Sequence, residues 1–175
     1  MPIKVLSPEL AAKIAAGEVV ERPASVVKEL VENSLDAGAT AISVDIKGGG
    51  LELIRVVDNG SGIPSEEAEL AFHRFATSKL PLEGNLDSIT TLGFRGEALP
   101  SIAAVSTVSL VTRPAHQPAG TLVEVARGEI VRTAPQGSPP GTSIAVRDLF
   151  QNVPARLKFL KSPSAEAARV QTFLH

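Results

Sequence analysis

The sequence predicts an α+β fold in which helices pack against a mixed β-sheet. Apolar residues recur at helical spacing in the first 38 residues, and a strict alternation begins at Ile42. Several short strand-like segments follow a long stretch that has no clear period. With 175 residues and 43% hydrophobic content, the chain is long enough for one domain with a substantial core.

Two helices are expected at the start of the chain. Ser7-Pro8-Glu9 combines an N-cap, a first-turn proline and a first-turn acid, and Gly17 ends this helix. A second helix is expected over residues 23–38, where Gly38 is the stop signal. Its apolar stripe consists of Val27, Leu30, Val31 and Leu35.

Strands fill most of the remaining chain. Residues 42–46 alternate, Gly48-Gly49-Gly50 turns the chain, and residues 51–57 form the expected partner strand. Further strands are expected over 105–111, 120–126, 129–133 and 143–146. Short helices are expected near Pro64, over 94–104 and from Pro154, the last broken at Ser162-Pro163. Residues 74–92 indicate a long loop, and loops of that length are usually functional or mobile.

Composition excludes several classes of protein. The chain has no Cys, which excludes disulfides, thiolate metal sites and a Cys nucleophile. Its aromatic residues are six Phe with no Trp or Tyr, so binding of nucleic acid through base stacking is not expected. No stretch approaches the roughly 20 apolar residues of a membrane span, and a cytoplasmic protein is expected.

Charge is distributed unevenly along the chain. Residues 1–100 carry 15 acids and 9 bases, a net of −6, whereas residues 101–175 carry 4 acids and 8 bases, a net of +4. The asymmetry fits chance and solvated surfaces as well as it fits a basic end that meets phosphates.

Two groups of residues could carry chemistry near the second helix. Glu29 and Asn33 are four residues apart and share a helix face, so they could bind a hydrated Mg²⁺ and activate a water. The alternative is a solvated boundary face. The loop Asp58-Asn59-Gly60-Ser61-Gly62 could present a carboxylate at a strand end, with glycines admitting a ligand, or it could simply be a turn.

Two further groups suggest contacts with phosphate. Gly93 and Gly96 flank Arg95 at an expected helix start, where free N–H groups bind anions, although a glycine-capped helix is the simpler interpretation. Thr77-Ser78-Lys79 could contact phosphates or lie in a solvated loop. Neither group fits the Walker or the Rossmann phosphate-binding pattern.

Taken together, these segments resemble the MutL family of DNA mismatch repair proteins. The matching segments follow the order of the family and are 14–23, 28–39, 58–63, 75–79, 93–99 and 148–156. They span nearly the whole chain, and six ordered blocks are far more specific than any one of them. The family shares its Bergerat-type (GHKL) ATP-binding fold with gyrase B, Hsp90 and histidine kinases. The resemblance therefore implies a two-layer α/β sandwich with a mixed sheet and a nucleotide pocket under a mobile lid.

The resemblance also assigns roles to residues of a Mg²⁺-dependent ATPase. Glu29 is the implied general base, Asn33 the implied Mg²⁺ ligand, and Asp58 the implied acceptor for the adenine amino group. Gly60 and Gly62 are implied to permit close approach of the nucleotide. The other implied ATP contacts are Thr142, Thr77, Ser78, Lys79, Leu92, Gly93, Phe94, Arg95 and Gly96, with a lid over roughly residues 74–96.

The chain departs from the family pattern at three positions and in its extent. Pro100 stands where a small residue is usual, Leu157 where a second basic residue is expected, and Gln151 where an aromatic is common. Family members continue with a second, ribosomal S5-like domain, which supplies a lysine to the γ-phosphate, and a C-terminal dimerisation domain. Residues 1–175 are therefore expected to be an N-terminal ATP-binding domain, with weak or no hydrolysis on its own.

The implied function is ATP binding and hydrolysis in mismatch repair. ATP would order the lid and drive N-terminal dimerisation that couples mismatch recognition to downstream repair. The implied partners are a second copy, the mismatch-recognition protein MutS and non-specific DNA, without a membrane, and a bacterial protein would associate with the nucleoid. Candidate DNA contacts are Arg147, Arg156, Lys158, Lys161 and Arg169. The alternative is a nucleotide-gated interaction module with negligible turnover.

Overall fold

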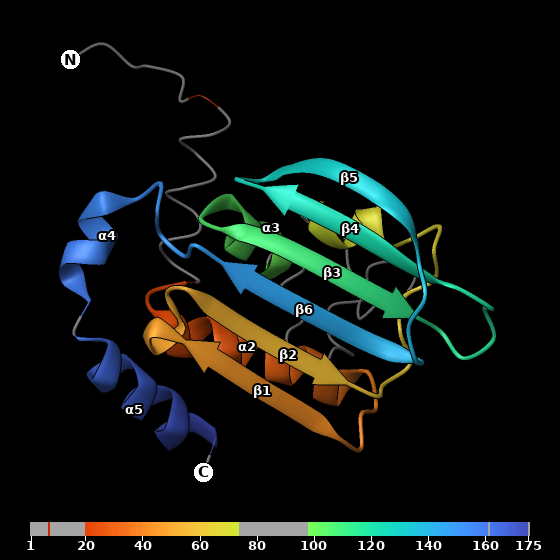
Figure 1. Cartoon of the computed structure of the whole chain (residues 1–175), viewed down its shortest axis with the longest axis horizontal. Coiled ribbons are helices and arrows are strands. Elements are labelled where there is room, and N and C mark those ends of the chain that lie inside the picture. Colours follow the sequence, from red (N-terminus) through yellow and green to blue (C-terminus); the bar gives the residue numbers. More distant parts are fainter. Residues whose placement is uncertain (1–6, 8–19, 74–97, 161, 175) are drawn as a thin grey trace, which may run out of the picture.

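The computed structural model describes Ser7 and residues 20–73, 98–160 and 162–174 (Figure 1). The expected first helix, apart from Ser7, and the expected loop over 74–92 lie outside the described residues. The elements are α2 (Pro23–Asp36), β1 (Ile42–Lys47), η1 (Gly48–Gly50), β2 (Leu53–Asp58), η2 (Glu69–Phe72), α3 (Ala98–Ala104), β3 (Thr107–Arg113), β4 (Gly120–Ala126), β5 (Glu129–Gln136), β6 (Gly141–Arg147), α4 (Pro154–Phe159) and α5 (Pro163–Leu174).

The six described strands form one sheet in the order β1-β2-β6-β3-β4-β5. Every neighbouring pair is antiparallel. The expected α+β sandwich is confirmed, but the described sheet is antiparallel throughout rather than mixed. The reason lies in the connections: β1–β2 and β3–β4–β5 are joined by short turns, and β6 enters between β2 and β3 running opposite to both.

Rows of side chains cross the buried face of the sheet, because cross-strand partners lie side by side. One row is entirely apolar: Ile46, Ile54, Val146, Val108 and Val125. The next is also apolar: Val44, Val56, Ile144, Leu110 and Val123. The third row becomes polar after Ile42 and contains Asp58, Thr142, Thr112 and Thr121. The buried face is therefore apolar over most of its area and polar at one end.

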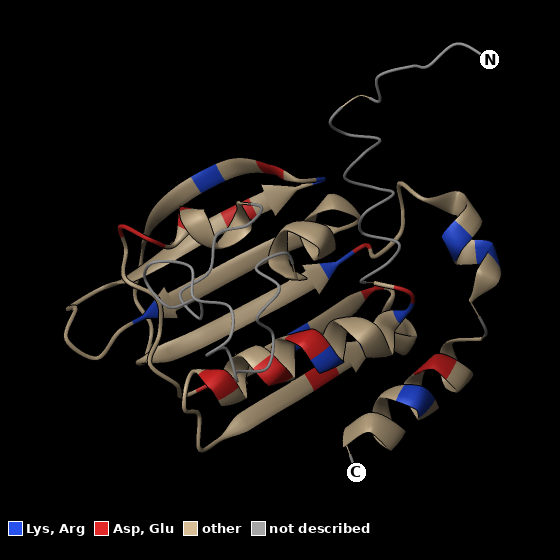
Figure 2. Cartoon of the chain, turned by 180° about the vertical axis from the view of Figure 1, so that it is seen from behind, with Lys and Arg blue, Asp and Glu red and all other residues tan. Residues whose placement is uncertain are grey.

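Helices α2 and α3 cover this face, and none of the described helices lies over the opposite face of the sheet (Figures 1 and 2). The core includes Leu30, Ile102 and Leu110, whose side chains are fully buried. Each such side chain contributes about 1.5–3 kcal/mol relative to an exposed one. Two layers therefore stabilise the domain, with the polar row at the margin of the apolar core.

Helix α2 begins where Pro23 was expected to start it, and Gly38 adopts a left-handed φ of 76° just beyond its end. The predicted buried stripe needs a correction, because Leu35 is 53% exposed while Val26 and Ser34 are buried. The helix turns Ser34 towards the polar row, where a hydroxyl finds a partner and a leucine would not.

The chain near Pro64 forms turns followed by η2 rather than the expected regular helix. The expected break at Ser162-Pro163 is confirmed and separates α4 from α5. Helix α5 packs on η1 and on α2, and the carboxylate of its fully buried Glu166 lies 3.8 Å from the Arg22 guanidinium. This ion pair joins α5 to the residue that precedes α2.

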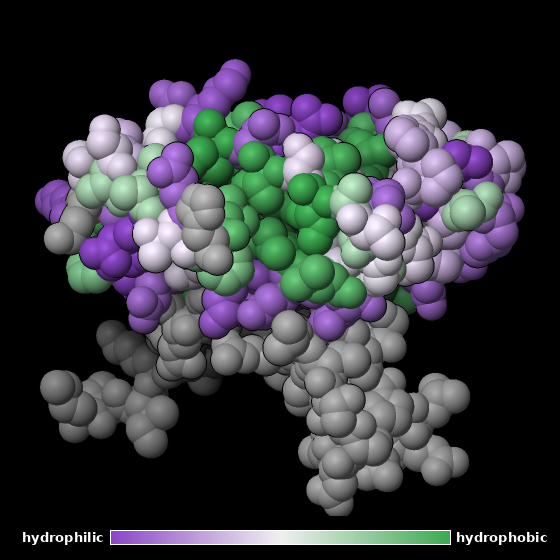
Figure 3. Space-filling model, turned by 90° about the horizontal axis from the view of Figure 1, so that it is seen from below, coloured by the Kyte–Doolittle hydropathy of each residue, from purple (hydrophilic) through white to green (hydrophobic). Residues whose placement is uncertain are grey.

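Hydrophobic side chains gather on the side of the molecule at the β1 edge (Figure 3). Ile42, Val44 and Ile46 of this edge strand are only half-buried, and α2 contributes the exposed Leu35. Within the described part of the chain, no helix has the length and apolar character needed to cross a bilayer.

Candidate functional site

The polar end of the buried sheet face brings together residues from separate parts of the sequence. Asp58 ends β2, and its cross-strand partner on β6 is Thr142. Thr142 is in turn the partner of Thr112 on β3. A carboxylate and two hydroxyls thus lie in one row across three neighbouring strands, and α2 lies over the same face.

Asp58 is held by hydrogen bonds on both carboxylate oxygens. The Ser34 hydroxyl donates to Oδ2 over 2.7 Å, and the Gly60 N–H donates to Oδ1 over 2.8 Å. A carboxylate oxygen has about two acceptor sites, so each can accept one more hydrogen bond. The side chain is half-buried, which leaves it accessible to a ligand. Asp58 is therefore an oriented acceptor at the margin of the core.

The loop after Asp58 is fixed on two sides. The Asn59 side chain accepts from the N–H groups of Thr40 and Ala41 and donates to the Thr40 hydroxyl. The Ser61 N–H donates to the Ala37 carbonyl at the end of α2 over 2.9 Å. The loop is thus tied to the segment between α2 and β1 and is more ordered than an isolated glycine-rich turn.

Two glycines are required where this loop meets the sheet. Gly62 has a φ of 71°, and a Cβ there would overlap the Arg113 carbonyl at the end of β3. Gly141 has a φ of 123°, and a Cβ there would overlap the Asp58 carbonyl. Both the left-handed backbone and the close approach exclude a side chain.

Thr112 connects the loop to Thr142. Its Oγ1 accepts the Ile63 N–H over 2.8 Å and lies 2.8 Å from the Thr142 Oγ1. The side chain is completely buried. A buried hydroxyl with these two neighbours holds the glycine-rich loop against β3 and β6 at one point.

Glu29 and Asn33 lie on one face of α2, as predicted from their spacing. Glu29 is 8% exposed, an unusual degree of burial for a carboxylate, and Asn33 is half-buried. Acidic residues recur along α2 (Figure 2). The described residues contain no group of three His, Cys, Asp or Glu that could hold a metal. One amide beside one carboxylate suits a cation that keeps most of its own waters, as Mg²⁺ does.

The predicted phosphate-side residues lie outside the described part of the chain. They are Thr77, Ser78, Lys79, Leu92, Gly93, Phe94, Arg95 and Gly96. The structure therefore brings together Asp58, Gly60, Gly62 and Thr142, and places Glu29 and Asn33 on α2.

Sequence reasoning missed three residues of this region: Ser34, Thr112 and Gly141. Ser34 directly precedes Leu35, which the predicted apolar stripe of this helix included in its place. Thr112 lies one residue beyond the strand predicted over 105–111, and Gly141 lies two residues before the strand predicted over 143–146. The alternation Val108, Leu110, Thr112 was the available signal, because it puts the hydroxyl on the buried face.

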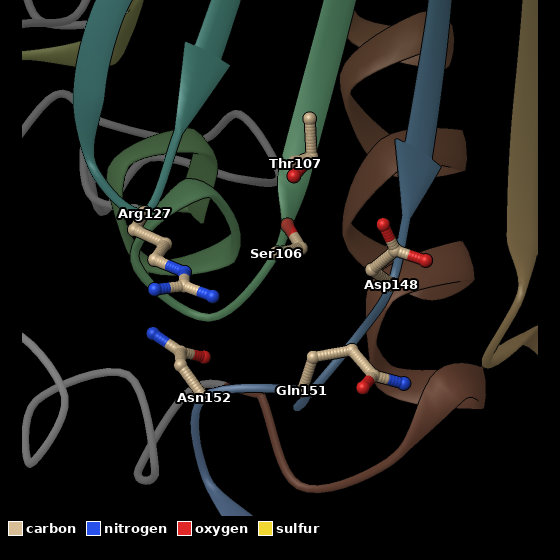
Figure 4. A pocket seen from close by; sticks show the side chains of 6 residues that line it. All are labelled: Ser106, Thr107, Arg127, Asp148, Gln151 and Asn152. Carbon is tan, nitrogen blue, oxygen red and sulfur yellow. The ribbon is translucent and has the colours of Figure 1, made fainter.

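A second polar hollow lies at the opposite ends of β3 and β6. It is lined by Ser106, Thr107, Arg127, Asp148, Gln151 and Asn152. The Arg127 side chain points towards Asn152 (Figure 4). Asn152 donates to the Ala104 carbonyl over 3.0 Å, and the Phe150 N–H donates to the Val105 carbonyl over 2.7 Å. These contacts satisfy carbonyl groups at the end of α3 and account for the hollow as part of the scaffold.

The sequence that forms this fold and polar row matches a known family of ATPases. A family model described as histidine kinase-, DNA gyrase B- and HSP90-like ATPase matches residues 21–134. The chain therefore belongs to this ATPase family.

Within the family, the chain is similar to the DNA mismatch repair protein MutL. It is 60% identical to MutL of Pelotomaculum thermopropionicum over 95% of the chain, and 58% identical to MutL of Koribacter versatilis over 98%. The chain spans 27% of the length of each of these two relatives.

Solved structures give the same result. The Aquifex aeolicus MutL ATPase domain complexed with ADP superposes with a TM-score of 0.73 at 40% identity, over 89% of this chain and 54% of that one. The N-terminal domain of a DNA repair protein superposes with a TM-score of 0.78 at 32% identity, over 94% of this chain and 47% of that one.

Replacing Gly62 with Ala tests the close packing of the loop. Gly38 provides a matched control, since it also has a left-handed φ of 76° but has open space at the Cβ position. Gly38→Ala should lower the free energy of unfolding by about 1 kcal/mol from backbone strain alone. Gly62→Ala should lower it by roughly 2–4 kcal/mol, since overpacking adds about 1–3 kcal/mol. Urea unfolding measures both, and equal losses would contradict the account.

Proposed function

We propose that the chain binds ATP at the polar end of the sheet and hydrolyses it in the presence of Mg²⁺. The observation that carries the proposal is Asp58, a carboxylate fixed by Ser34 and Gly60 with acceptor capacity left over. Membership of the ATPase family and the similarity to a MutL ATPase domain complexed with ADP support it. The polar row is the part of the sheet's buried face that hydrophobic packing does not explain.

Asp58, Gly60, Gly62 and Thr142 are proposed to hold the adenine. The Asp58 carboxylate accepts a hydrogen bond from the amino group. The two glycines hold the loop in place beside the base, because a Cβ would overlap Ala37 at Gly60 and Arg113 at Gly62. A ligand without the amino group leaves the remaining acceptor site of the half-buried carboxylate unused, which gives selectivity for adenine.

Glu29 is proposed to be the general base. Its carboxylate takes a proton from water as the water oxygen attacks the γ-phosphorus, and the bond from phosphorus to the bridging oxygen breaks with the electron pair leaving on ADP. Asn33, one helical turn further on, is the proposed protein ligand of Mg²⁺, and bound Mg²⁺ supplies charge neutralisation at the phosphates.

The phosphate side of the site is proposed to come from the lid, roughly residues 74–96. Thr77, Ser78, Lys79 and Leu92 contact the nucleotide there, and the backbone N–H groups of Gly93 to Gly96 bind the phosphates. Lid ordering by ATP and dimerisation of the N-terminal domains belong to the same proposal.

The alternative function is a nucleotide-gated interaction module with negligible turnover. The length of the MutL relatives favours keeping it, because the chain spans only 27% of each and a lysine from a second domain is proposed to reach the γ-phosphate. Turnover per subunit, measured with and without the remaining domains, separates the two functions. Slow turnover that rises when the second domain is present supports the ATPase, and none in either form supports the module.

Replacing Glu29 with Gln tests its role in hydrolysis. Glu29→Gln keeps the shape of the side chain but removes the base, so kcat should fall at least about 100-fold with the Kd for ATP changed less than about threefold. Glu32→Gln on the same helix is the matched control and should retain kcat, since Glu32 lies outside the proposed site. Phosphate release and equilibrium titration give the two constants, and full turnover by Glu29→Gln would exclude the role.

The whole protein is proposed to act in the cytoplasm, in DNA mismatch repair, with a second copy, MutS and non-specific DNA as partners. A doubling of mass on adding a non-hydrolysable ATP analogue, measured by light scattering, tests dimerisation.

The described basic residues proposed to meet DNA are Arg147, Arg156, Lys158 and Arg169, all exposed or half-buried. Co-purification of MutS with the full-length protein tests the repair assignment.

Contacts between these basic residues and DNA should be electrostatic. The affinity for duplex DNA should fall by at least about tenfold between 50 and 200 mM salt and should not depend on sequence. Fluorescence anisotropy with two unrelated duplexes measures both properties. An affinity that does not change with salt would refute this part of the proposal.

A further inference from the structure

We infer that Thr112 is a positioning residue that sets the direction of the Thr142 hydroxyl proton and thereby selects a 6-aminopurine over a 6-oxopurine. This inference rests on the proposed function, in which Asp58 and Thr142 hold the base. It goes further because Thr112 is buried beneath the proposed contacts and does not itself reach the ligand.

Three polar groups surround the Thr112 hydroxyl, which is completely buried. The Ile63 N–H donates to its Oγ1 over 2.8 Å. The Thr142 Oγ1 lies at 2.8 Å, and the Gly141 carbonyl oxygen lies at 3.4 Å. A threonine hydroxyl has one proton to donate and two acceptor sites. Its single proton therefore goes either to Thr142 or to the Gly141 carbonyl.

Hydrogen-bond distance favours Thr142. An O–H···O bond has its usual length near 2.7–2.8 Å, and 3.4 Å lies beyond the normal range. Either hydroxyl of this pair could donate, and we assign the Thr112 proton to the Thr142 Oγ1 because it is the nearer acceptor, while Thr112 accepts the Ile63 N–H. The Thr142 proton then cannot be used towards Thr112 and is turned to the open side of the row. Thr142 is half-buried, so this proton is available to a ligand.

The resulting pattern is an acceptor next to a donor. Asp58 accepts, and Thr142, its direct cross-strand partner, donates. The edge of a 6-aminopurine presents the complementary pair, an amino donor beside the ring-nitrogen acceptor N1, which Thr142 reaches directly or through one water. A 6-oxopurine presents an acceptor and then an N1–H donor, so both of its groups oppose those of the protein. The 6-oxopurine is rejected because its acceptor faces the Asp58 acceptor and its N1–H donor faces the Thr142 donor, so neither pair forms a hydrogen bond.

A purely structural role for Thr112 makes a different prediction. If the hydroxyl only held the loop through the Ile63 N–H, its loss would weaken all nucleotides alike. The proposed positioning role instead links Thr112 to a single ligand atom, the ring nitrogen N1. Comparison of ATP with 1-deaza-ATP, which lacks the N1 acceptor, isolates that atom.

The experiment measures the Kd of ATP, GTP and 1-deaza-ATP by calorimetry for the wild-type chain and three variants. Thr112→Val removes the hydroxyl at nearly constant volume, and Thr112→Ser retains it. Thr121→Val is the matched control, since Thr121 is the buried partner of Thr112 on β4, one strand further from Asp58. Thermal unfolding of each variant reports its folding.

The wild-type chain should bind ATP about tenfold more tightly than 1-deaza-ATP and more tightly still than GTP. In Thr112→Val, the preference for ATP over 1-deaza-ATP should fall to less than about threefold, and the preference for ATP over GTP should shrink. Thr112→Ser and Thr121→Val should keep the wild-type ratios within about threefold.

Unchanged ratios in Thr112→Val would overturn the inference and leave the proposed function intact. Equal wild-type affinity for ATP and 1-deaza-ATP would overturn the inference without any variant, even if Thr112→Val fails to fold. A wild-type chain that binds no ATP would overturn the proposed function itself.

Discussion

The carboxylate of Asp58 joins three parts of the molecule that the sequence keeps apart. It ends β2, accepts a hydrogen bond from Ser34 on α2, and accepts another from Gly60 at the start of the glycine-rich loop. The helix layer, the sheet layer and the loop therefore meet at one charged group. The hydrogen bonds to its two oxygens tie α2 and the loop to the end of β2.

The division of the sheet's buried face lets one surface stabilise the fold and also carry the proposed ligand site. Two apolar rows bury their side chains under α2 and α3 and supply the hydrophobic stabilisation. The third row, at the margin of the core, contains Asp58 and three threonines. The backbone packs so closely there that no side chain fits at position 62 or 141, where Gly62 and Gly141 stand. A rigid polar margin next to a dry core is a setting in which hydrogen bonds discriminate between ligands.

Local patterns in the sequence predicted most of the elements, and a family resemblance indicated the candidate site. The start of α2, the alternation in β1 and the break at Ser162-Pro163 follow from spacing, proline and glycine, which act over a few residues. The antiparallel direction of β6, the exposure of Leu35 and the contacts of Ser34 and Thr112 depend on which strands become neighbours. Those pairings join distant residues, such as Asp58 and Thr142, 84 positions apart, and Ile63 and Thr112, 49 positions apart, so no local pattern contains them. Asp58 depends on both kinds of information. The glycine-rich loop that follows it is evident in the sequence, but the hydrogen bond from Ser34 on α2 that orients its carboxylate is not.

The central claim is that Asp58 is the acceptor that holds the base of ATP, and calorimetric titration of Asp58→Asn tests it most directly. The substitution keeps the size of the side chain but replaces one acceptor oxygen with an NH₂ donor, which opposes the amino group of adenine. The account predicts an ATP affinity at least about tenfold weaker than that of the wild type, equivalent to about 1.4 kcal/mol, in a protein that remains folded. A folded Asp58→Asn chain that binds ATP with wild-type affinity would contradict it.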